Sequence, residues 1–308
     1  MGILINLSGK MRHPKINTAR KSKAVMLAIV IFTFILLAFG AFAAYAQSKN
    51  TEKPFVLGKI VTMHSNELNE DRVLNVYLPD GYDQDDTARY AVIYLLDGGA
   101  DEDFIHIVGL VQFNSFEWVN RLPKTIVVGV ANVDRRRDFT YPTTLPEDKA
   151  AYPASGHSDK FIAFLGNELI PFIDKKYKTT GAKTIIGESL GGLLATEIVL
   201  KQPSLFTQYI IVSPSLWWDN GSLLRRNPVI PAVPIKVYIG VGKEGIWPAK
   251  IPHVMEDDAR LLADKLKGAE DNGVQVFFDY LPQENHATVS HQAVFNAFRL
   301  LYPAKESH

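Results

Sequence analysis

The stretch from Thr184 to Ala195 constrains the fold more than any other part of the chain. An apolar, β-branched run enters Gly187-Glu188-Ser189-Leu190-Gly191, and a run of helix-forming residues follows it. A G-x-S-x-G pattern between a strand and a helix predicts a sharp turn that presents Ser189 as a nucleophile. Gly187 and Gly191 are predicted to be necessary there, because side chains would collide with the adjoining strand or helix.

The rest of the chain alternates strand-like and helix-like segments. Apolar and polar residues alternate at 55–64 and 72–78, which predicts two half-buried antiparallel strands. Continuous apolar runs predict buried strands at 90–96, 125–130, 183–186, 209–212, 235–239 and 274–281. Helical spacing predicts helices at 104–120, 159–177, 190–201, 255–267 and 290–302. This order predicts an α/β-hydrolase fold, with a mainly parallel sheet, antiparallel N-terminal strands and helices on both faces.

Residues 1–46 have the layout of a targeting segment. Six basic residues precede the uncharged apolar run 24–46, which ends in Ala44-Tyr45-Ala46; they are Lys10, Arg12, Lys15, Arg20, Lys21 and Lys23. This order predicts a signal peptide over residues 1–46 and an exported, periplasmic protein. The run is also long enough to span a bilayer, so an uncleaved anchor is the alternative. Residues 47–308 are predicted to form a single domain.

Charge and composition narrow the partners and cofactors. Without the six basic residues of the targeting segment, 27 basic residues remain against 33 acidic ones, a formal charge of −6. We therefore expect no nucleic-acid partner, and membrane contact only through the N-terminal segment if it is uncleaved. The chain has no cysteine, which excludes disulfides, a thiol nucleophile and a thiolate metal site. We expect no metal or cofactor, and the sequence leaves the oligomeric state open.

His286 is the predicted base for Ser189. In α/β-hydrolases the catalytic residues follow in the order serine, acid, histidine. His286 lies in a polar loop directly after the strand 274–281, at the sheet edge where sites assemble. His157, in the long irregular segment 131–158, is the main rival, although it precedes the serine. Five further histidines are poorly placed: His13, His64, His106, His291 and His308.

The acid is expected in the loop after the strand 235–239. Glu244 is the first carboxylate there, while Asp257 and Asp258 follow on the next predicted helix. Position favours Glu244, but all three stay candidates. Two backbone N–H donors are needed for the oxyanion, and the expected ones are those of Leu190 and Gly99.

Five blocks in order carry a family resemblance. They are YLLDG at 94–98, RDFT at 137–140, FIDKKY at 172–177, GESLGG at 187–192 and SPSLWW at 213–218. Over residues 55–302 the chain resembles the Putative esterase family of α/β-hydrolases, which includes esterase D. The similar branch is that of the periplasmic ferric-enterobactin esterase-like hydrolases.

The resemblance implies Ser189 as nucleophile, His286 as base, and Gly99 with Leu190 as oxyanion donors. It also implies that the position of the acid varies among members of the family, and that some members of the branch use only a Ser–His pair. Glu188 departs from the family pattern, in which histidine is common at this position.

The resemblance and the residues together predict a metal-independent serine ester hydrolase that forms an acyl-enzyme. Arg135, Arg137, Trp217 and Trp218 are predicted to bind a small, anionic aromatic ester of the siderophore type. The alternative for these four is that the tryptophans are core residues and the arginines are solvated or ion-paired. Two other functions stay open: an acyltransferase of the mycolyltransferase type, and a non-catalytic siderophore-binding protein on a hydrolase scaffold.

Overall fold

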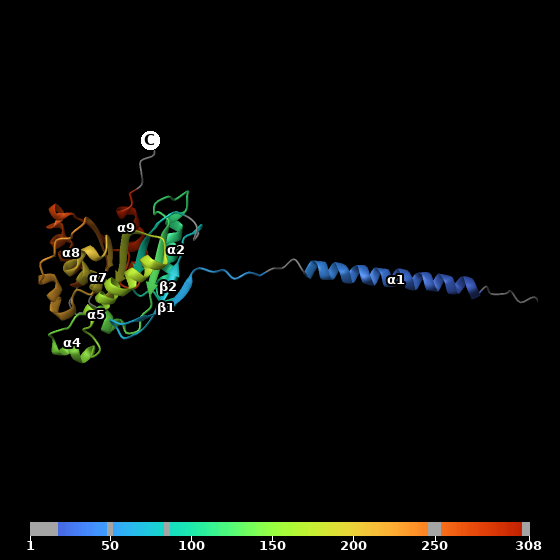
Figure 1. Cartoon of the computed structure of the whole chain (residues 1–308), viewed down its shortest axis with the longest axis horizontal. Helices are drawn as coiled ribbons and strands as arrows, with labels where there is room; N and C mark the ends of the chain where they lie inside the picture. Colours follow the sequence, from blue (N-terminus) through green and yellow to red (C-terminus); the bar gives the residue numbers. More distant parts are fainter. Residues whose placement is uncertain (1–17, 48–51, 83–86, 246–253, 304–308) are drawn as a thin grey trace, which may run out of the picture. The chain divides into compact units, whose positions relative to one another are not determined.

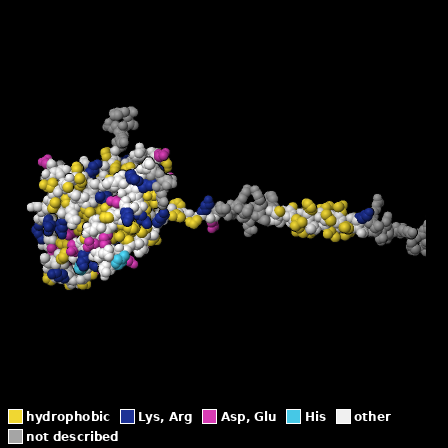
Figure 2. Space-filling view, in the orientation of Figure 1, with side chains coloured by type: hydrophobic (Ala, Val, Ile, Leu, Met, Phe, Trp, Pro, Cys, Tyr) yellow, Lys and Arg dark blue, Asp and Glu magenta, His cyan; other side chains and the backbone are white. Residues whose placement is uncertain are grey.

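The computed structural model describes residues 18–47, 52–82, 87–245 and 254–303. The chain divides into two compact units, Met1–Val56 and Leu57–His308. In the first unit, helix α1 spans Thr18–Gln47. Its stretch Ser22–Ala41 is long and apolar enough to cross a bilayer, and Figure 2 displays its hydrophobic surface. Among the predicted features, Lys10, Arg12, Lys15, His13 and His308 lie outside the described residues.

The larger unit is built on one eight-stranded sheet in the order β1-β2-β4-β3-β5-β6-β7-β8. Strands β1 and β2 pair antiparallel, as do β2 and β4, and all the remaining pairs are parallel. The bounds are β1 Lys59–Ser65, β2 Glu70–Tyr77, β3 Tyr90–Leu95, β4 Thr125–Val130, β5 Thr179–Glu188, β6 Gln208–Val212, β7 Ile235–Gly242 and β8 Val274–Leu281. The predicted fold class is confirmed, including its antiparallel beginning.

Helices cover both faces of this sheet, as Figure 1 shows. One hydrophobic layer lies beneath α2 (Phe104–Ser115) and α9 (Val289–Leu301). The other lies beneath α7 (Leu190–Lys201), α8 (Val254–Lys267) and a helical run formed by α5 (Ser158–Ala163), a π-helix and α6 (Ile170–Lys176). Strand β4 is buried at every position, as expected for a strand covered on both sides.

Two predicted boundaries differ from the structure in ways that matter for the site. The helix predicted at 104–120 ends at Ser115, because Phe116 takes an extended conformation. The segment 131–158, predicted to be irregular, contains α3 (Arg135–Phe139) and α4 (Pro146–Ala151). Helix α3 begins where the Asp134 side chain accepts hydrogen bonds from the N–H groups of Arg136 and Arg137. This cap fixes the position of the neighbouring Arg135.

The parallel pairing brings four loops to one edge of the sheet. Glu188 pairs with Val212, and Val212 pairs with Gly240. Further along, Gly242 pairs with Leu281. The loops that follow β5, β6, β7 and β8 therefore all leave the sheet at the same end, where sites of open α/β sheets assemble.

Candidate active site

Ser189 lies at the apex of the turn between β5 and α7. Its backbone has φ 57° and ψ −115°, a strained conformation of the kind found at the nucleophile of α/β-hydrolases. The turn is held by the Ser189 N–H, which donates to Val212 O at 3.0 Å. A Cβ on Gly187 would lie 2.3 Å from Gly191 O, so a side chain is impossible there. At Gly191 the nearest obstacle is the Asp97 side chain at 3.3 Å, a weaker constraint than predicted.

His286 and Glu244 complete a hydrogen-bonded row with Ser189. The Nε2 atom of His286 lies 3.1 Å from Ser189 Oγ, and its Nδ1 atom lies 2.7 Å from Glu244 Oε2. The Glu244 side chain is 1% exposed, whereas that of His286 is 36% exposed. A base that reaches solvent and is held by a buried carboxylate has the geometry for proton transfer from the serine.

The rival residues lie elsewhere. Asp257 and Asp258 belong to α8, and neither has a hydrogen bond to His286 among the described residues. His157 precedes α5 and does not line the pocket around Ser189. The rings of His106 and His291 stack on each other, and His64 pairs with Asp71.

Gly99 does not offer a free N–H in this structure. Its N–H donates to Glu102 Oε2 at 2.6 Å, and Asn132 also donates to the Glu102 carboxylate. The prediction for Gly99 rested on its position in the loop after the third strand, but in the structure the nearby Glu102 side chain binds its N–H. Leu190 opens α7, so its N–H is among those that a helix leaves without an intrahelical acceptor.

Arg135 lies between the turn at Asp97 and the nucleophile. Its Nε and Nη2 atoms donate to the two carboxylate oxygens of Asp97 at 2.6 and 3.0 Å. The Nη2 atom also donates to Glu188 O, the carbonyl just before Ser189, at 3.1 Å. The guanidinium is thus held rigidly at the wall of the pocket that contains Ser189.

A pocket of about 180 Å³ opens over the serine. Its walls include the turn between β5 and α7, the loop after β6, helix α3 and the segment that follows α3. The lining residues are Arg135, Arg136, Thr140, Tyr152, Ser189, Leu190, Ser215, Trp217, Trp218 and His286. Trp218 is almost fully buried, and its Nε1 donates to Tyr141 O at 2.9 Å, so most of this side chain belongs to the core.

Arg137 does not line this pocket. It pairs with Glu70 and Asp138, which also bind the buried Arg72, so it belongs to an ion-pair network beside β2. The substrate-binding prediction for Arg137 therefore does not match the structure, whereas Arg136 lines the pocket and lies over the Tyr152 ring. Arg135 and Arg136 thus line the pocket while Arg137 pairs with Glu70, a difference that sequence spacing in an apparent loop could not reveal.

Two serines that sequence reasoning did not assign contact the site. Ser213 donates to Glu244 Oε1, and Ser215 Oγ lies 3.2 Å from Ser189 Oγ. The available signal was small polar residues directly after a buried strand at the edge where the site forms.

The charges around His286 set its proton affinity. The hydrogen bond that His286 donates to Glu244 raises the pKa of His286 above its ordinary value of 6.5, and the charge of Glu188 adds to this, whereas burial and Arg135 oppose it. Burial raises the pKa of Glu188 to about 7, with Asp103 and Asp97 adding to the effect and His286 and Arg135 opposing it.

We expect kcat/KM to rise with pH along a limb centred above 6.5, because an imidazole placed like that of His286 can accept a proton from Ser189 only when it is neutral. In Glu188→Gln the limb should move to lower pH, since an ionised Glu188 favours the protonated imidazole. A pH profile with a neutral ester measures this shift, and Glu147→Gln on the exposed face of α4 is the matched control. An unmoved limb in Glu188→Gln would contradict the assignment of this limb to His286.

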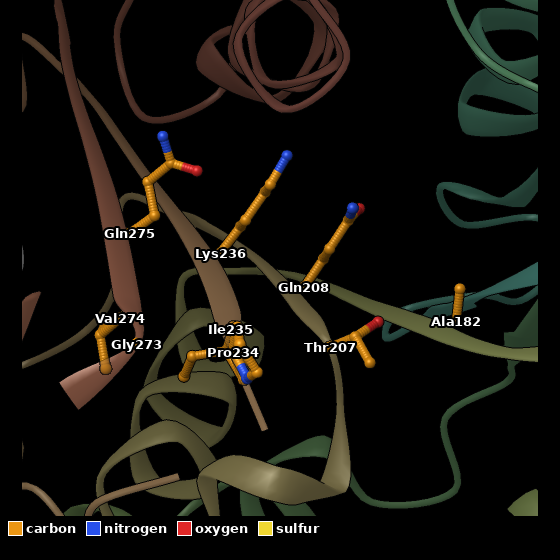
Figure 3. A pocket seen from close by; sticks show the side chains of 9 residues that line it. All are labelled: Ala182, Thr207, Gln208, Pro234, Ile235, Lys236, Gly273, Val274 and Gln275. Carbon is orange, nitrogen blue, oxygen red and sulfur yellow. The ribbon is translucent and has the colours of Figure 1, made fainter. Parts of the chain in front are cut away.

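A larger cavity lies away from this site. It has a volume of about 760 Å³ and is lined at the amino ends of β6, β7 and β8 by residues such as Thr207, Pro234 and Gly273 (Figure 3). The long side chains there, Lys236 and Gln208, bind Leu301 O and the Tyr302 hydroxyl at the end of α9. This cavity holds none of the predicted site residues, so its volume does not mark the catalytic centre.

Known proteins place the chain in a family. Residues 65–270 match the family described as Putative esterase. Ferri-bacillibactin esterase BesA of Bacillus subtilis (strain 168) is 29% identical over 255 residues, which cover 76% of this chain and 87% of that protein.

Solved structures agree with that match. An IroE-like serine hydrolase from Shewanella oneidensis has a TM-score of 0.71 at 29% identity, covering 80% of each chain. The BES protein from Bacillus cereus has a TM-score of 0.70 at 25% identity, covering 83% of this chain and 98% of that one. The chain therefore belongs to the Putative esterase family and is a serine esterase of the α/β-hydrolase fold.

Proposed function

We propose that Ser189, His286 and Glu244 form the catalytic triad of this esterase. The observation that carries the proposal is the unbroken row from Ser189 Oγ through the His286 ring to Glu244, with contacts of 3.1 and 2.7 Å. His286 Nε2 takes the serine proton while Oγ attacks the ester carbonyl carbon. The buried Glu244 carboxylate orients the ring and stabilises the imidazolium that forms.

The proton then passes from His286 to the departing alkoxide, which leaves an acyl group on Ser189. Water enters, gives its proton to His286 and attacks the acyl carbon. Ser189 leaves with the proton returned by His286, and the free acid is released.

We propose that the Arg135 guanidinium and the Leu190 N–H stabilise the oxyanion, in place of the expected pair of backbone donors. Two observations support Arg135: it is clamped to Asp97 and to the carbonyl preceding Ser189, and Gly99 already has an acceptor. A fixed cation at the wall of the pocket can stabilise negative charge that develops on the carbonyl oxygen.

Replacing Arg135 by Met should lower kcat for a neutral ester about 10²- to 10³-fold, the usual cost of losing one oxyanion donor. A neutral ester such as p-nitrophenyl acetate separates this role from binding an anionic substrate, which would show mainly in KM. Arg136→Met is the matched control, because Arg136 lines the same pocket, whereas it is Arg135 that donates to the Glu188 carbonyl. An Arg135→Met enzyme with normal kcat on the neutral ester would contradict the assignment.

We propose small aromatic esters of the siderophore type as substrates. One relative is named a ferri-bacillibactin esterase and another a siderophore enterobactin esterase, and the pocket here combines guanidinium groups with aromatic faces. Arg135, Arg136, Tyr152 and Trp217 could contact anionic aromatic rings by hydrogen bonds, stacking or cation–π interaction.

One panel tests the reaction class. A ferric catecholate trilactone and a series of short-chain esters are assayed on the same preparation, with and without sugar acceptors. We expect hydrolysis of both substrate types, with the trilactone giving the higher kcat/KM. Faster ester turnover with a sugar acceptor, with transfer products, would indicate an acyltransferase. Tight trilactone binding without any hydrolysis would indicate a binding protein.

We also propose that the catalytic unit is exported and that the segment 1–46 is removed after Ala46. The apolar stretch Ser22–Ala41 and the basic residues before it support export. N-terminal sequencing of the protein from its native compartment distinguishes a chain that begins at Gln47 from an anchored one.

A further inference from the structure

The segment Ser213-Pro214-Ser215, which follows β6, contacts both ends of the triad. We propose that this segment holds Glu244 and Ser189 in fixed positions relative to each other. In it, Ser213 is a positioning residue for Glu244, and Ser215 is a catalytic residue that donates a hydrogen bond to Ser189 Oγ. The inference rests on the proposed function, whose nucleophile and acid it takes as given.

Ser213 supplies the second hydrogen bond of the buried Glu244 carboxylate. One oxygen of Glu244 faces His286 Nδ1 at 2.7 Å, and the other accepts the Ser213 hydroxyl. Ser213 itself is fully buried, so water does not replace this donor in the folded protein. A buried carboxylate requires hydrogen-bond partners, and two fixed donors set the plane of the group and hence its direction toward His286.

The backbone at Ser213 indicates that the hydroxyl itself is needed. Its φ is 38°, a left-handed conformation in which glycine or asparagine is less strained than serine. The Ser213 N–H continues the β6–β7 ladder by donating to Gly240 O at 2.8 Å, which holds the residue in this conformation. Glycine would be less strained at this position, so the presence of serine indicates that its side chain is needed.

Ser215 reaches the nucleophile twice. Its N–H donates to Ser189 O at 3.0 Å, and its Oγ lies 3.2 Å from Ser189 Oγ. A hydroxyl has one proton and two lone pairs, so Ser189 can donate to His286 and still accept from Ser215. During deacylation the bond between the acyl carbon and Ser189 Oγ breaks, and negative charge develops on Oγ. Ser215 keeps its own proton and stabilises that charge until His286 returns a proton to Oγ.

The segment is seated on α7 by the absence of a side chain at Gly192. A Cβ there would lie 2.9 Å from Val212 O and 3.0 Å from Pro214 Cα. Helix α7 begins at the nucleophile, so close packing of Pro214 against it fixes Ser213 and Ser215 relative to Ser189.

The test compares Ser213→Gly and Ser215→Ala with the unmodified full chain on p-nitrophenyl acetate. Rates are divided by the concentration of sites titrated with a fluorophosphonate, so that misfolded protein does not count. Glycine suits the backbone of residue 213, which keeps that variant folded. Ser115→Ala, a serine at the far end of α2, is the control, and Ser215→Thr tests rescue by a retained hydroxyl.

We expect Ser213→Gly to lower kcat per titrated site about 10- to 100-fold, the range for losing a hydrogen bond to a charged group. The rise of kcat/KM with pH should move to lower pH in this variant, because a Glu244 carboxylate that turns away from His286 no longer favours the protonated ring. The other charged groups near the ring, Glu188 and Arg135, are unchanged. Ser215→Ala should lower kcat about tenfold without moving the limb, and Ser215→Thr should recover most of the loss.

Normal turnover per titrated site in both variants would overturn the proposal. The proposal would also be overturned if the variants had fewer titratable sites but normal kcat at each site, because that result indicates a purely structural role. An unmodified chain that takes up no fluorophosphonate would overturn the proposed function and this inference together.

Discussion

Ser189→Ala is expected to lower kcat about a millionfold, because the acyl-enzyme cannot form without the hydroxyl. The residual rate should still exceed that of the uncatalysed reaction about 10³- to 10⁴-fold, since the remaining groups still bind the ester and stabilise the oxyanion. Steady-state and single-turnover assays on a chromogenic ester measure both rates. Substrate affinity should change little, because the other residues that line the pocket are unchanged.

The fold of this variant needs its own check. Ser189 has a positive φ, so alanine retains the strain while losing the hydroxyl, and thermal unfolding should be compared with the unmodified chain. Ser115→Ala again serves as the control for loss of a serine hydroxyl outside the site. A folded Ser189→Ala protein with more than about one thousandth of normal kcat would contradict the mechanism, since such a rate needs another nucleophile.

Glu244→Gln is expected to lower kcat about 10⁴-fold with little change in KM. An amide in place of the carboxylate presents the wrong partner to His286 Nδ1 and cannot stabilise the imidazolium, which is the effect known for the acid of a serine triad. The variant keeps the size of the side chain, so the hydroxyl of Ser213 still has an acceptor. Turnover of a neutral ester at the plateau of the pH profile measures the loss.

Asp257→Asn and Asp258→Asn are the matched controls for Glu244. Both residues lie on α8, and among the described residues it is Glu244 that hydrogen-bonds to His286 Nδ1, so each variant should keep nearly full kcat. A small loss in Glu244→Gln would instead indicate that Ser189 and His286 act as a pair.

The sequence predicts the scaffold because its signals are local. Strand β4 and helix α7 have the predicted bounds, since continuous apolar runs and helix formers need no distant partner to be recognised. Helix α2 is shorter than its pattern, because the extended conformation at Phe116 depends on how the following loop packs. Helix α3 lies in a segment predicted to be irregular, because its five residues are too few to show a periodic pattern, even with a capping aspartate before them.

The candidate site could be predicted only in part. The order serine, acid, histidine led to Ser189 and His286, and position alone favoured Glu244, which the structure brings to 2.7 Å from His286. The Gly99 prediction does not fit, because only the folded turn reveals that Glu102 binds its N–H. The role proposed for Arg135 depends on its two-point contact with Asp97, 38 residues away in the chain, for which one sequence carries no signal.

In the proposed mechanism Ser189 is the nucleophile and His286 activates it. Incubation of the full-length protein with a fluorophosphonate, followed by peptide mass mapping, tests the role of Ser189. We expect one phosphonyl group per chain, attached to Ser189, and much slower labelling in His286→Ala. Labelling of a different residue, or none on folded and ester-active protein, would contradict it.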